Sequence, residues 1–196
     1  MVDLTSFNTA QDLFKALPTA GRDMKAIPTD QPPDEFCRSL LGGKVPEESI
    51  TFCAYMLPKR VAVRWGHDCL TCLTDLLDER DRRMLALVRN WIDEPEEDRR
   101  HAAMDEAMGT DQKTPGIWIA LAAAWSSGSL GLGGTLAVAP APSLTARAVN
   151  AGILAGLARV ALADRMSVLT AFAEMGIDFA ATERARRYGK GLDGGK

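Results

Sequence analysis

Residues 114–127 read TPGIWIALAAAWSS, and no charged side chain lies between the proline and the second tryptophan. Thr114 followed by Pro115 is typical of a helix start, because threonine caps a first turn and proline fits the first helical position. Trp118 and Trp125 are seven residues apart, so they share one face of this helix. Because the helix is apolar on nearly every side, we expect it to lie buried at the centre of the fold.

Similar signals mark helices on both sides of this stretch. Prolines followed by acidic residues open several segments, and glycines close them. No segment alternates with period two for long enough to require a sheet. The sequence predicts an all-α protein, a single multi-helix bundle domain of about seven to nine helices. The expected helices cover residues 9–17, 33–41, 47–57, 59–77, 80–92, 96–109, 115–127, 143–161 and 164–176.

A length of 196 residues suits one domain with short tails. The Pro-rich stretch before Pro33 indicates that residues 1–31 form a flexible N-terminal arm and linker, and whether this arm docks on the bundle is left open. Residues 32–182 form the predicted helical domain. The last predicted helix stops at Gly176, and residues 183–196 are expected to be a disordered basic tail.

Composition excludes some classes of function. The net charge is −3, with no basic excess of the kind that nucleic-acid binders show. No apolar run reaches the about 18 residues that a membrane span needs, and the first residues lack the pattern of a secretory signal. We therefore expect a cytoplasmic protein, with no nucleic-acid partner and no membrane span, and nothing in the sequence indicates a cofactor.

The four cysteines are expected as free thiols. Residues 67–72 read HDCLTC, which could hold zinc or perform redox chemistry. On one continuous helix, however, Cys69 and Cys72 fall on an apolar stripe with Trp65 and Leu76, whereas His67 points to the polar side. We therefore favour core packing for both cysteines. The segments EFCRSLL and TFCAYML, sixteen residues apart, share a Phe-Cys pair that fits either coincidence or duplication.

Glu97, His101 and Asp105 are spaced by four residues on one predicted helix, so they share a face. Such a row could bind a metal or relay a proton. Because its neighbours, Arg100 among them, are polar, a solvated face with charge pairs explains the same pattern without a function.

The longest irregular segment follows the central helix and carries GSLGLGG from residue 128. It lacks the lysine and the strand–loop–helix context of a phosphate-binding loop. Long loops in compact domains are often functional. We expect a partner-binding surface on residues 127–142, and its candidate contact residues are Trp125, Leu130, Leu132, Leu136 and Val138.

Small residues recur at a spacing of four on the helix that contains Ala151, Gly152, Ala155 and Gly156. This pattern lets helices approach closely. In a chain with no membrane span, tight internal packing is the favoured interpretation, and self-association into a homodimer is the alternative.

Four stretches resemble an uncharacterised family of small bacterial helical proteins: YMLPKRVAVRWG, TPGIWIALAAAWSSGSL, PSLTARAVNAGIL and FAEMGIDFA. The resemblance covers about Tyr55 to Ala180. It implies one helical domain with an accessory role, associated with type VI secretion gene neighbourhoods, and supplies no catalytic residues.

We therefore expect a non-enzymatic adaptor or accessory protein that binds a protein partner, such as a component or effector of a bacterial secretion assembly. A metal-binding or hydrolytic enzyme that uses the Glu97–His101–Asp105 row, and a self-associating structural module, are the alternatives.

Overall fold

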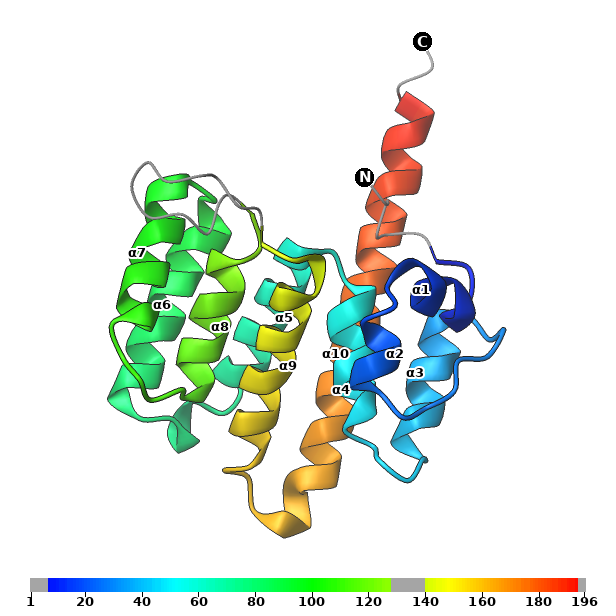
Figure 1. The fold of residues 1–196 in the computed structure, drawn as a ribbon, viewed down its shortest axis with the longest axis horizontal. Coiled ribbons are helices and arrows are strands. Elements are labelled where there is room, and N and C mark those ends of the chain that lie inside the picture. The colour runs from blue at the N-terminus through cyan, green and yellow to red at the C-terminus, as the bar shows by residue number, and fades with distance from the viewer. Residues whose placement is uncertain (1–6, 128–139, 194–196) are drawn as a thin grey trace. The chain divides into compact units, whose positions relative to one another are not determined.

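The buried helix predicted at residues 114–127 is α8 (Pro115–Ala124) in the computed structural model (Figure 1), and every residue of α8 except Trp118 is buried. The structure describes residues 7–127 and 140–193, and within these ranges it contains helices and no strands. The all-α class is confirmed. The other helices are α1 (Ala10–Ala16), α2 (Ala20–Asp23), α3 (Pro33–Leu41), α4 (Glu48–Met56), α5 (Lys59–Thr71), the short 3-10 helix η1 (Thr74–Leu76), α6 (Glu79–Asp93), α7 (Glu97–Met108), α9 (Pro142–Leu157) and α10 (Leu162–Asp193).

The chain divides into two compact units, residues 59–168 and residues 1–58 with 169–196. In the first unit α8 packs against α5, α6, α7 and α9, which surround it in Figure 1. The predicted central position of this helix is therefore confirmed for the unit that contains it. The predicted arm, domain and tail at 1–31, 32–182 and 183–196 stay a prediction.

Glycines allow the helices around α8 to approach closely. A Cβ atom on Gly66 of α5 would lie 2.8 Å from Ile119 Cδ1, and one on Gly152 of α9 would lie 2.7 Å from the same atom. A Cβ on Gly156 would lie 2.5 Å from Leu70 Cδ2. The small residues of α9 therefore serve packing inside this unit, as the favoured interpretation expects.

Within the second unit, residues 23–26 dock on α4, which answers the question that the sequence leaves open. The Glu48 carboxylate of α4, only 8% exposed, accepts hydrogen bonds from the backbone N–H groups of Lys25 (2.6 Å) and Ala26 (3.0 Å). The Tyr55 hydroxyl donates to the Asp23 carboxylate over 2.5 Å. Residues 23–26 are therefore tied to α4 by charge-assisted hydrogen bonds.

Two predicted helix ends are wrong. The helix predicted over 59–77 ends as α5 at Thr71, and η1 follows it. The predicted stop at Gly176 does not occur, because α10 continues through this residue to Asp193. Ile177 and Ala180 are buried beyond the glycine, so the apolar stripe of α10 continues past it. One extra helical turn, α2, forms within the predicted linker.

None of the helices in the described ranges is both long enough and apolar enough to cross a membrane.

Candidate functional site

The predicted row of Glu97, His101 and Asp105 lies on α7, as expected. Glu97 Oε1 is 3.4 Å from His101 Nε2, and both side chains are about half exposed. The Glu97 carboxylate, however, accepts hydrogen bonds from Arg100 Nε (2.9 Å) and Nη2. No group of three or more His, Cys, Asp or Glu side chains within the described ranges could hold a metal ion. The geometry therefore joins Glu97 to arginine and histidine, not to Asp105.

Arg100 is the residue of this helix that sequence reasoning misplaced, because the polar face was expected to be solvated throughout. Its side chain is 1% exposed, and Nη1 donates to the carbonyl of Ala124 over 2.6 Å. Ala124 is the last residue of α8, so the guanidinium satisfies a carbonyl that the helix end leaves without a partner. Arg100 precedes the buried Ala103, Met104 and Ala107 at spacings of three, four and seven, and this spacing was the signal available in the sequence.

Contact with Arg100 also changes the acidity of Glu97. The hydrogen bond from Arg100, with the charges of Arg100 and His101, holds the pKa of the Glu97 carboxyl below its ordinary value, while its limited burial acts in the opposite direction. The Arg100 Nη2 atom lies 2.9 Å from His101 Nε2. The cluster therefore anchors the end of α8.

The HDCLTC stretch is divided by the end of α5. Cys69 is fully buried, as expected for core packing, and burial raises the pKa of its thiol well above the ordinary value. The expectation for Cys72 is wrong: it is exposed, because it lies beyond Thr71, where the helical stripe no longer applies. His67, expected on a polar face, is 6% exposed, and its Nδ1 lies 2.9 Å from Asp68 Oδ1.

Four of the five predicted partner-binding residues, Leu130, Leu132, Leu136 and Val138, lie outside the described residues. The fifth, Trp125, is the C-cap residue of α8 and is partly buried. Its backbone carbonyl accepts a hydrogen bond of 2.9 Å from the Thr145 hydroxyl of α9.

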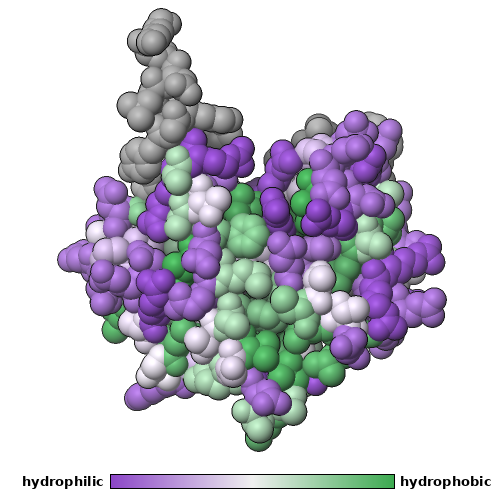
Figure 2. All heavy atoms as spheres, turned by 180° about the vertical axis from the view of Figure 1, so that it is seen from behind, coloured by the Kyte–Doolittle hydropathy of each residue, from purple (hydrophilic) through white to green (hydrophobic). Residues whose placement is uncertain are grey.

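An exposed apolar surface that the sequence did not reveal lies at the turn between α9 and α10. We call it the corner surface, and it consists of Leu76, Leu162 and Met166, with exposed fractions of 44%, 82% and 49%. The guanidinium of Arg159 donates to the Leu76 carbonyl over 3.2 Å, which places η1 beside the turn. Figure 2 shows hydrophobic side chains at the lower edge of the view, where Figure 1 draws this turn.

A buried ion pair fixes the turn behind the corner surface. Asp81 of α6 is fully buried, and its Oδ2 accepts a hydrogen bond of 2.6 Å from Arg159 Nη1. Its Oδ1 accepts a hydrogen bond of 2.8 Å from the backbone N–H of Gly116 in α8. A buried carboxylate needs such partners, since an unpaired charge in the interior is costly. No sequence pattern predicts this pair, because its members are 78 residues apart.

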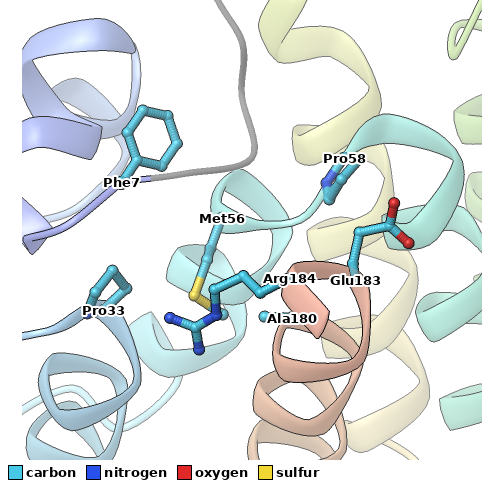
Figure 3. Close-up of a pocket in the computed structure, with 7 residues that line it drawn as sticks. All are labelled: Phe7, Pro33, Met56, Pro58, Ala180, Glu183 and Arg184. Atoms are coloured by element: carbon cyan, nitrogen blue, oxygen red, sulfur yellow. The ribbon is translucent and has the colours of Figure 1, made fainter. Parts of the chain in front are cut away.

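The residues around α4 and α10 line a small, partly open pocket (Figure 3), formed by Phe7, Pro33, Met56, Pro58, Ala180, Glu183 and Arg184. Its volume is about 20 Å³, which is close to the space that a single water molecule needs. In Figure 3 the Arg184 side chain extends toward Met56.

Of the comparisons with known proteins, the one with protein families gives a match. No curated protein and no solved structure matches it. Residues 36–180, which include all of the unit 59–168 and part of the other unit, match a family described as a family of unknown function, DUF6931. The match covers about three quarters of the chain and agrees with the resemblance to an uncharacterised family. The chain belongs to the DUF6931 family.

Proposed function

We propose that this chain is a non-enzymatic adaptor that binds another protein through the corner surface. One observation carries the proposal: three large apolar side chains, Leu76, Leu162 and Met166, are exposed around a turn that the buried Asp81–Arg159 pair holds in place. A preorganised apolar surface loses little conformational freedom on binding, so burying it favours association.

The charges beside the corner surface indicate the chemistry of the partner. Asp75 precedes Leu76, and Asp164 follows Leu162 in the first turn of α10, and both acids are exposed. The nearest arginines are engaged. Arg159 pairs with Asp81, Arg165 donates to the carbonyls of Ala158 and Val160, and Arg82 donates to those of Thr74 and Leu77. An amphipathic helix with an apolar face and flanking Lys or Arg residues complements this pattern.

The proposal also includes the origin, the location and the assembly in which the adaptor acts. A bacterial origin and a role in a type VI secretion assembly are supported by the sequence resemblance alone, and a cytoplasmic location is proposed from the sequence patterns described above. The loop at residues 127–142, with Trp125 at its start, stays a proposed second contact surface.

The test uses the full chain with an affinity tag in the cells that produce it. Proteins that co-purify are identified by mass spectrometry, and the candidate partner is then purified and titrated against the chain. Leu162→Asp is expected to weaken binding at least about tenfold. In the proposed complex the partner buries Leu162, and the substitution would put a charge at that position. Aspartate in a first helical turn is favourable, so the variant keeps its fold.

Met108→Asp is the matched control, since Met108 is 58% exposed on the same unit but is not part of the corner surface. It is expected to bind like the unaltered chain. A chain that lacks residues 128–140 separates the two surfaces. If this deletion abolishes binding and Leu162→Asp does not, the loop and not the corner surface is the contact site. If no protein binds the chain in a titration, the adaptor proposal fails.

A further inference from the structure

The Phe-Cys pair that occurs twice in the sequence comes together in space. Cys37 of α3 and Cys53 of α4 are both fully buried, and their sulfur atoms are 3.3 Å apart. The rings of Phe36 and Phe52 meet edge to face, with centroids 5.0 Å apart. The two similar segments therefore form one paired arrangement that joins α3 to α4.

Each sulfur is also held by a backbone carbonyl. Cys37 Sγ donates to the Ser49 carbonyl over 3.6 Å, and Cys53 Sγ donates to the Ala173 carbonyl of α10 over 3.7 Å. A disulfide bond has a sulfur separation of about 2.05 Å. Since the thiols already lie in contact, bond formation needs a movement of about 1.2 Å, which rotation of the two side chains can supply.

The Cys-x-x-Cys of HDCLTC does not provide such a pair. Cys69 is buried within α5, and Cys72 is exposed beyond the end of that helix. The pair that the fold assembles is the one that the sequence separates by sixteen residues.

We propose that Cys37 and Cys53 form a redox-active thiol pair that hydrogen peroxide, or another small peroxide, converts to a disulfide between α3 and α4. One thiolate attacks a peroxide oxygen, which forms an S–O bond, breaks the O–O bond and releases hydroxide. The second thiolate then attacks the resulting sulfenic sulfur, which forms the S–S bond and releases another hydroxide. The two thiol protons neutralise the two hydroxides, so one peroxide and two thiols give one disulfide and two water molecules.

The phenylalanines next to the two cysteines pack against the N-terminal segment. Phe14 of α1 packs on both aromatic rings, with centroids 6.2 Å from Phe36 and 6.3 Å from Phe52. Because both thiols are fully buried, bulky disulfide reagents are excluded from the folded chain. The two Glu48 hydrogen bonds hold that segment on α4, so its local opening sets the rate at which peroxide enters.

The experiment uses the full chain with Cys72→Ser, which removes the exposed thiol and its intermolecular reactions. The folded protein is treated with hydrogen peroxide, unfolded, alkylated and cleaved with trypsin. Arg38 and Lys44 lie between the two cysteines, so the disulfide joins two separate tryptic peptides. We expect these linked peptides, loss of two of the three free thiols, and recovery of both after reduction with dithiothreitol.

Two further measurements accompany the peptide analysis. The oxidised protein is expected to unfold at a temperature about 5 °C or more higher, because the bond restricts the unfolded chain. Glu48→Gln is expected to speed the linkage several-fold, and equal rates would overturn the proposed route of entry. The proposal itself is overturned if all three thiols remain after prolonged peroxide treatment, or if the linked peptide contains Cys69.

Discussion

Gly116 is a position at which one added methyl group would meet backbone instead of a side chain. A Cβ there would lie 2.6 Å from the carbonyl oxygen of Asp81 and 2.8 Å from its Cα. The N–H of Gly116 also donates to the Asp81 carboxylate, so α6 and α8 cannot separate without breaking a buried hydrogen bond. We expect Gly116→Ala to lower the free energy of unfolding by about 2 kcal/mol. Gly42→Ala is the control, since the nearest atom to its added Cβ is 3.8 Å away; urea unfolding of both variants tests the difference.

The cysteines give a second prediction at this scale. Cys72 is exposed, whereas the other three cysteines are buried. A bulky aromatic disulfide reagent should therefore react rapidly with one thiol per folded chain and with four after unfolding in urea. The Cys72→Ser variant should lose the rapid reaction. Two rapid thiols in the folded chain would contradict the burial of Cys37, Cys53 and Cys69.

Cys69 also makes stability depend on alkaline pH. Burial raises the pKa of its thiol in the folded state, so the unfolded chain loses this proton first as the pH rises. The contribution is complete below the ordinary thiol pKa of about 8.5 and is lost above it, with a slope of up to about 1.4 kcal/mol per pH unit. We expect Cys69→Ala to flatten the fall in stability between pH 8 and about pH 10, measured by urea unfolding at each pH. Parallel curves for the two proteins would contradict this assignment.

At the scale of elements, a buried guanidinium adds a hydrogen bond between the packed helices α7 and α8. Arg100→Met keeps much of the side-chain volume but leaves the Ala124 carbonyl without its donor. We expect a loss of about 2 kcal/mol in the free energy of unfolding. Arg99→Met is the matched control, because Arg99 is 36% exposed and pairs with Glu94 at the surface, where an ion pair contributes less than about 1 kcal/mol. Chemical denaturation compares the two variants, and equal losses would show that Arg100 acts only as a surface charge.

Helix starts could be predicted from the sequence more reliably than helix ends. Pro115 begins α8 and Pro33 begins α3 as expected, because proline at a first turn acts locally. Thr114 takes the N-cap position of α8, but its side chain makes no capping hydrogen bond, unlike the cap that the sequence predicts. Ends depend on packing: Gly176 lies inside α10, where buried neighbours on both sides outweigh the cost of about 1 kcal/mol for an internal glycine.

The candidate sites follow the same distinction between local and distant information. Spacing placed Glu97 and His101 on one face, and the structure shows them 3.4 Å apart. The Asp81–Arg159 pair and the Cys37–Cys53 contact join residues from different helices. Helical periodicity describes one helix at a time, so it carries no information about which helices meet.

In the whole molecule, we expect a local change at Glu48 to stay within one of the two compact units. Glu48 holds the backbone N–H groups of Lys25 and Ala26, and residues 59–168 form a separate compact unit. We expect Glu48→Gln to accelerate amide hydrogen exchange in residues 7–31, because a neutral amide accepts weaker hydrogen bonds and can offer only one oxygen. Exchange within residues 59–168 should stay unchanged, and it serves as the internal control. Hydrogen–deuterium exchange followed by mass spectrometry reads both regions in one experiment. If residues 7–31 exchange freely in the unaltered chain, the docking of the N-terminal segment is wrong; if exchange rises across 59–168 as well, the two units unfold together and are not independent in stability.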